Sequence, residues 1–127
     1  MQNLKKLIEL VAHKQQIDLK RGEAKYMDTN WLLEAINDEV QEVKEEIKPN
    51  NRPYLEDELG DILWGWLTLI EKLKDEGLVS SHEKILQRCL TKYEQRILPL
   101  KGTSEDHAIW QEVKKEQKIV LKKETKE

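Results

Sequence analysis

The chain has 127 residues, 37% of them charged, and a formal net charge of −3 at neutral pH. This length suits one domain with a modest core and is too short for two. The small negative charge argues against non-specific binding to nucleic acid or to an anionic membrane surface. A single cysteine excludes an internal disulfide, and no apolar stretch approaches the roughly 20 residues of a membrane span. We therefore expect a soluble, cytoplasmic protein.

The first three helices are predicted from apolar residues that recur at helical spacing. Gly22 is a plausible stop for a helix that begins near the N-terminus. A second helix is expected over about residues 29–47. Pro53, whose fixed φ suits a first helical turn, opens a third helix that ends near Gly77.

Two more helices are predicted in the rest of the chain. Ser80 and Glu83 form a capping-box pattern for a fourth helix, which Pro99 closes. Gly102 breaks the chain again, and Thr103 with Asp106 suggests the start of a last helix. This helix runs through Trp110 into a charged tail that we expect to fray after about residue 119. No stretch alternates long enough to form a strand. The expected fold is an all-α bundle of about four to five helices, with residues 1–127 forming a single domain.

Two acidic steps, Glu39-x-x-Glu42 and Glu58-x-x-Asp61, are the most informative pattern in the chain. Residues three apart on a helix share a face, so each step directs two carboxylates to one point. The short loop between the second and third helices makes them antiparallel neighbours, with the two steps at the same height. Four converging carboxylates repel one another unless a cation lies among them, and Mg²⁺ prefers such oxygen ligands. The pattern predicts metal-assisted phosphate chemistry, although charged helices often carry such steps as solvated faces.

The position of each acid relative to the apolar stripe favours a half-open site. At about 100° per residue, Glu39 and Glu58 fall at the edge of the apolar stripes, whereas Glu42 and Asp61 lie further towards solvent. Gly60, inside the second step, costs roughly 1 kcal/mol relative to alanine in a helix, so a reason for it is expected. A phosphate or another backbone that approaches closely would be such a reason, and a simple helix–helix contact would serve as well.

Several segments together resemble the MazG-type nucleotide pyrophosphohydrolase family. Residues 38–42 (DEVQE) and 58–61 (ELGD) are similar to its E-E-x-x-E and E-x-x-D signature, with Asp38 where the family usually has Glu. Residues 92–96 (KYEQR) match its lysine and arginine four apart, and residues 110–118 resemble its late W-x-x-x-K segment. The chain lacks the Pro-Trp-Asp segment of many bacterial members, which leaves the preferred base open.

This resemblance implies Mg²⁺-dependent hydrolysis of nucleoside triphosphates to monophosphate and pyrophosphate, with Mn²⁺ as a possible substitute, by a homodimer or homotetramer. The metal ligands and catalytic residues implied are Glu39, Glu42, Glu58 and Asp61. The substrate-binding residues implied are Lys92, Arg96, Trp110 and Lys114. The general base stays open between a carboxylate, such as Glu42 or Asp38, and a water activated by the metal.

Other functions remain as alternatives. A di-iron carboxylate bundle needs Glu-x-x-His pairs, and a P-loop enzyme needs G-x-x-x-x-G-K-[ST]; the sequence contains neither. The rival from another class is a non-catalytic helical interaction or regulatory protein. Among enzymes, a dUTP- or dCTP-directed relative or a phosphoribosyl-ATP pyrophosphohydrolase shares the acidic pattern. The tryptophans Trp31, Trp64 and Trp66 are interpreted as packing residues, and Trp64, which lies off the main apolar stripe, is a candidate for a subunit interface.

Overall fold

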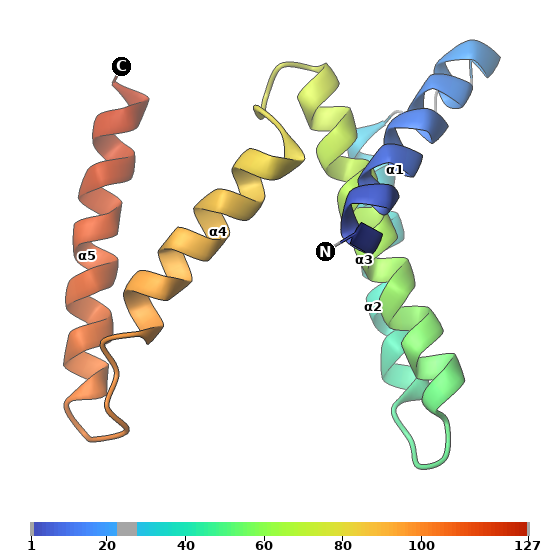
Figure 1. The fold of residues 1–127 in the computed structure, drawn as a ribbon. Coiled ribbons are helices and arrows are strands. Elements are labelled where there is room, and N and C mark those ends of the chain that lie inside the picture. Colours follow the sequence, from blue (N-terminus) through green and yellow to red (C-terminus); the bar gives the residue numbers. More distant parts are fainter. Residues whose placement is uncertain (1, 23–27, 127) are drawn as a thin grey trace. The chain divides into compact units, whose positions relative to one another are not determined.

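The computed structural model describes residues 2–22 and 28–126. In these residues it contains five α-helices and no strand, which confirms the predicted all-α class (Figure 1). The helices are α1 (Gln2–Arg21), α2 (Thr29–Glu46), α3 (Arg52–Asp75), α4 (His82–Ile97) and α5 (Asp106–Thr125).

The helices form two compact units, one ending at His82 and the other beginning at Glu83. In the first unit, α3 packs against both α1 and α2 (Figure 1). The apolar side chains that recur at helical spacing meet along these contacts. They form a small core of Val11, Leu32, Leu67, Leu69 and Ile70. The candidate site residues on α2 and α3 are therefore positioned by a helical hairpin that α1 supports.

The predicted breaks in the first unit lie where expected. Gly22 and Gly77, with φ of 70° and 76°, end α1 and α3 in the left-handed conformation that glycine adopts without steric cost. The Leu78 amide donates to the Leu73 carbonyl at 2.9 Å, which closes the end of α3. Pro53 lies in the first turn of α3, and Asn50, with φ of 57°, makes the tight turn before it. The sequence thus located the hairpin that brings the acidic steps together.

The helix α4 begins one residue later than its predicted cap requires. Because α4 starts at His82, the residue before it is Ser81, so the expected capping box of Ser80 and Glu83 is out of register. Before α5, the Asp106 carboxylate accepts hydrogen bonds from the Lys101 and Gly102 amides, both at 2.8 Å. These hydrogen bonds lower the pKa of Asp106, and the bond from Lys101 has the largest effect. The helix α5 runs to Thr125, beyond residue 119 where fraying was expected.

Large apolar side chains remain exposed on the second unit. Leu90 on α4 and Leu98 just after it are 63% and 75% exposed, and on α5 Ile119, Val120 and Leu121 are each about half exposed. Cys89 on α4 is also exposed. Among the described residues, no helix has the length and apolar character needed to cross a membrane.

Candidate functional site

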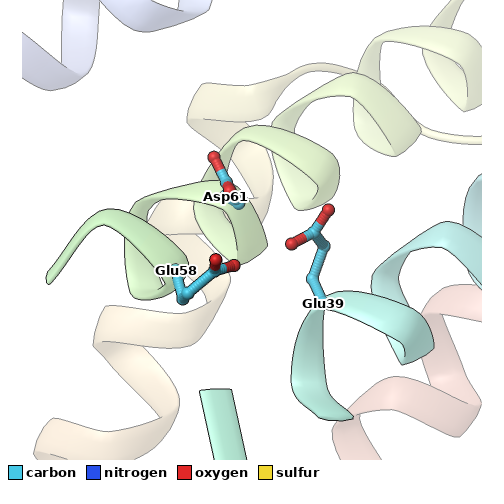
Figure 2. A group of neighbouring side chains, drawn as sticks. All are labelled: Glu39, Glu58 and Asp61. Carbon is cyan, nitrogen blue, oxygen red and sulfur yellow. The ribbon is translucent and has the colours of Figure 1, made fainter. Parts of the chain in front are cut away.

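Three of the four predicted acidic residues meet in the structure. Glu39 extends from α2 towards α3, where Glu58 and Asp61 lie one turn apart, and the three carboxylates face a common space (Figure 2). One carboxylate oxygen from each residue lies within 4.8 Å of the other two. Glu39 and Glu58 are half-buried and Asp61 is exposed, as the apolar stripes predicted. The site is therefore a recess at the edge of the core with one side open to solvent.

The inner carboxylate oxygens lack partners. The Oε2 atoms of Glu39 and Glu58 are buried, and neither has a hydrogen-bond partner among the described residues. A buried carboxylate oxygen without a partner is costly, because it has lost water and gained no donor in return. Oxygens in this state are suited to bind a cation. No lysine or arginine forms a salt bridge with Glu39 or Glu58 in the described part of the chain.

Repulsion within the cluster also appears in the pKa of Glu58. The nearby Glu42 carboxyl can share a hydrogen bond with a protonated Glu58, and this effect, together with burial, raises the pKa of Glu58 from 4.5 to about 7. The negative charges of Glu42, Asp61 and Glu39 act in the same direction. Without a cation, Glu58 therefore holds its proton to a higher pH than an ordinary glutamate does.

The pKa of Glu39 is also raised, but its largest cause differs from that for Glu58. Burial raises the pKa of Glu39 most, followed by the hydrogen bond and the charge of Glu42 and the charge of Asp61. Glu42 is exposed and lies outside the set of oxygens within 4.8 Å of one another, but it is close enough to act on both glutamates. The structure thus groups three acids tightly, with the fourth beside them.

The donor set suits a hard divalent cation. The three side chains offer only oxygen, and the arrangement is open on one side, as Mg²⁺ requires when it keeps waters and contacts phosphate. No histidine or cysteine belongs to the group, which does not favour zinc. The unpartnered oxygens and the raised pKa values fit the same cation. Glu39, Glu58 and Asp61 would hold it, with Glu42 adjacent.

The glycine near the acids has no contact that explains it. A Cβ added at Gly60 would have no heavy atom within 4 Å among the described residues, so the expected helix–helix contact is not there. One turn further along α3, a Cβ at Gly65 would lie 3.0 Å from Cγ1 of Ile36 on α2. Gly65, which the sequence analysis did not single out, is therefore the glycine that lets α2 and α3 approach closely.

The predicted substrate-binding residues lie in the second unit, where two of them, Arg96 and Trp110, are in contact. The Arg96 guanidinium lies over the Trp110 ring, 5.3 Å from its centroid, and the Arg96 Nε donates to Oε1 of Gln117 at 2.8 Å. Arg96 is only 9% exposed. Lys92 is exposed, and Lys114 is half-buried. Trp110 thus packs on a predicted substrate residue, and Arg96 is held in a fixed orientation.

A cavity of about 340 Å³ adjoins the acidic cluster within the first unit. Glu39 and Asp61 form part of its lining, and α1, α2 and α3 all contribute to its walls. Trp31 and Trp64, interpreted from the sequence as packing residues, line it as well. The sequence analysis missed this cavity, because its wall from α1 depends on how that helix packs against α3.

The fold and the acidic cluster together define an all-helical protein with a recess suited to a divalent cation. The MazG nucleotide pyrophosphohydrolase domain matches residues 28–97, which include α2, α3 and α4. The chain therefore belongs to the MazG family, and the resemblance found in its motifs is confirmed. Neither a curated protein nor a solved structure matches the chain significantly. Membership indicates a nucleotide pyrophosphohydrolase activity in general terms.

Proposed function

We propose that this protein hydrolyses nucleoside triphosphates to the monophosphate and pyrophosphate with the help of Mg²⁺, and that it removes unwanted nucleotides from the cytoplasmic pool. The observation that carries the proposal is the cluster of Glu39, Glu58 and Asp61, whose oxygens lie within 4.8 Å of one another. Two of these side chains have buried oxygens without a partner among the described residues. The family match over residues 28–97 supports the same activity.

The proposed reaction is a substitution at the α-phosphorus. A water oxygen forms a bond to this phosphorus while the bond to the oxygen that bridges to the β-phosphorus breaks, and the electron pair leaves with pyrophosphate. One proton of the water passes to a carboxylate base, for which Glu42 and Asp38 are the candidates. When bound, the cation neutralises charge that develops on the phosphate oxygens and the leaving group.

The remaining predicted residues act on the substrate. Lys92 and Arg96 lie one turn apart on α4 and are proposed to bind the polyphosphate, Arg96 through its planar fork. Gln117 fixes that fork through its hydrogen bond to Nε. Lys114 is a further phosphate ligand in this proposal, and Trp110 orients Arg96 by covering one face of its guanidinium.

Pyrophosphate release from a panel of nucleoside triphosphates, with and without Mg²⁺, tests this proposal. We expect release that requires Mg²⁺ and stops when the ion is chelated. A non-catalytic interaction protein, the second candidate, would release no pyrophosphate, and its melting temperature would not respond to Mg²⁺ with nucleotide. The unpartnered buried oxygens of Glu39 and Glu58 favour the enzyme, since a merely solvated acidic face would leave its oxygens in water.

We also propose that the protein acts as a homodimer or homotetramer. The apolar side chains exposed on the second unit support this, because exposed patches of large apolar residues commonly mark subunit interfaces. Leu90 and Leu98 are the most exposed of those on or next to α4. Burial of such residues between subunits would remove them from water.

A further inference from the structure

The cavity beside the acidic cluster runs away from it along the helical hairpin. On α3 its lining extends from Asp61 to Thr68, about 10 Å at 1.5 Å per residue. On α2 it extends in the opposite chain direction from Glu39 to Trp31, about 12 Å by the same rise. Because α2 and α3 form a hairpin, Thr68 and Trp31 lie at the same end. A triphosphate at the acids would therefore direct its nucleoside into this cavity.

The lining is suited to a flat heteroaromatic ring. Trp31 and Trp64 contribute aromatic surface, and Leu32, Ala35 and Ile36 contribute apolar surface. Stacking on aromatic side chains is a general way to bind bases and does not by itself distinguish them. A volume of about 340 Å³ lies at the lower end of the usual range for small-molecule sites, which suits one base with its sugar.

Asp18 on α1 is a nearly buried acidic residue in the lining of this cavity. It is only 3% exposed, and its carboxylate pairs with Lys14, whose side chain is 40% exposed. A nearly buried carboxylate whose partner among the described residues is a half-exposed lysine is expensive to maintain. Nε2 of Gln15 donates to Oδ2 of Asp75 at 2.9 Å, which places this stretch of α1 beside the second half of α3. Asp18 therefore lines the end of the cavity that lies away from Asp61.

A second acceptor lies at the same end. The Thr68 hydroxyl donates its hydrogen to the Trp64 carbonyl at 2.8 Å, so only its acceptor lone pairs remain for a ligand. Both Asp18 and Thr68 thus accept hydrogen bonds. If the phosphates of a nucleotide lie at the acidic cluster and its base lies in the cavity, the group on the base opposite the glycosidic bond reaches the end with Asp18 and Thr68. In cytosine and adenine that group is an amino group with two hydrogens, whereas in uracil and hypoxanthine it is a carbonyl oxygen.

We propose that the cavity receives the nucleobase and that Asp18, assisted by Thr68, selects bases with an exocyclic amino group at that position. A keto base would place its oxygen against the carboxylate, and this repulsion rejects it. The inference rests on the proposed function, since it assumes a nucleotide whose phosphates lie at Glu39 and Asp61.

Two matched pairs of substrates test the selection, dCTP against dUTP and ATP against ITP. We expect kcat/KM to favour the amino member of each pair by about 5- to 150-fold, the range that one well-placed pair of hydrogen bonds gives against the wrong base. Asp18→Asn should bring the ratio close to one, because the amide can donate to a keto oxygen. Glu9→Gln, an exposed change on the same helix, is the control and should leave the ratio unchanged.

A second variant, Thr68→Val, tests the proposal if Asp18→Asn fails to fold. Thr68→Val removes the second acceptor with little change in volume and should lower the ratio in the same direction. Equal or better use of dUTP by the wild type, or an unchanged ratio in whichever variant folds, overturns the proposal.

Binding of dCMP and dUMP, measured by titration calorimetry, separates this inference from the proposed function. Preference for dCMP that disappears in Asp18→Asn supports base selection even if no triphosphate is hydrolysed. Hydrolysis of all triphosphates at similar rates, with equal binding of dCMP and dUMP, would keep the proposed function and overturn the selection.

Discussion

Glu39 and Asp61 come from different helices and place their carboxylates in one small volume. We predict that Glu39→Ala lowers turnover by about 100-fold or more, the size expected when one group that stabilises transition-state charge is lost. Stability of the metal-free protein should stay the same or rise, because one source of repulsion is removed. Pyrophosphate release and thermal unfolding measure the two effects.

Glu45→Ala, an exposed change on the same helix, is the matched control and should alter neither property. Glu39 would instead be structural if its replacement unfolded the protein while activity per folded molecule stayed normal. Asp61→Ala should repeat the Glu39 result, since the two oxygens belong to one cluster.

The pKa of Glu58, raised from 4.5 to about 7, predicts the pH dependence of stability. The folded protein holds this proton more tightly than the unfolded chain does, so the stabilisation from it is complete below pH 4.5. It is lost as the pH rises through about 7, where the folded protein carries the full repulsion. We expect the melting temperature of metal-free wild type, relative to that of Glu58→Gln, to fall across this interval.

Glu56→Gln changes an exposed residue two positions before Glu58 on α3 and is the control. Its melting temperature should depend on pH in the same way as that of the wild type. Added Mg²⁺ should reverse the fall at pH 8 in the wild type, because the ion offsets the repulsion. A wild-type curve parallel to that of Glu58→Gln between pH 4.5 and 8 would contradict the prediction.

On the scale of a helix, α3 carries two glycines that we expect to behave differently. Gly60→Ala should stabilise the protein by up to about 1 kcal/mol, because a Cβ there meets nothing and alanine favours the helix. Gly65→Ala should gain less or lose stability, since its Cβ would press on Ile36 at 3.0 Å. Urea unfolding compares the two variants.

Activity adds a second readout for this pair. If Gly60→Ala is more stable but less active, the open face at Gly60 is where a phosphate approaches. If Gly60→Ala is less stable than the wild type, the residue has a contact in the folded protein that the free space beside it does not explain.

The helices themselves were largely predictable from local signals. Gly22, Pro53 and Gly77 act on their own neighbours through fixed or positive φ, so the first three helices end and begin as expected. The start of α4 was harder to predict from Ser80, because Ser81 beside it is equally suited to cap a helix. The hairpin loop then fixed the relative height of the acidic steps on α2 and α3, which made their meeting foreseeable.

On the scale of the whole molecule, we predict that the protein in solution has at least twice the mass of one chain. The exposed apolar side chains of the second unit, Leu90 and Leu98 among them, are the reason. Sedimentation equilibrium over a range of concentrations measures the mass directly. A single-chain mass at all concentrations would contradict the proposed assembly, and Leu90→Glu should shift the equilibrium towards single chains if α4 contributes to the contact.

What the sequence did not reveal depends on packing between distant segments. Asp18 and Trp64 are 46 positions apart, yet they line one cavity because α1 packs on α3. No local pattern on α1 marks Asp18, since a lysine and an acid four residues apart also form ordinary pairs on helix surfaces. The grouping of the acidic residues could be predicted from their spacing, whereas the cavity beside them depends on the fold.

The raised pKa of Glu58 has a consequence for calorimetry. An ion that binds beside this carboxyl near neutral pH must expel its hydrogen into solution, since metal ligands bind as anions. The apparent heat of ion binding would then include the ionisation heat of the buffer. Titrations in HEPES and in Tris, which differ in ionisation heat, should differ in measured enthalpy, and the slope of that difference counts the hydrogen ions released.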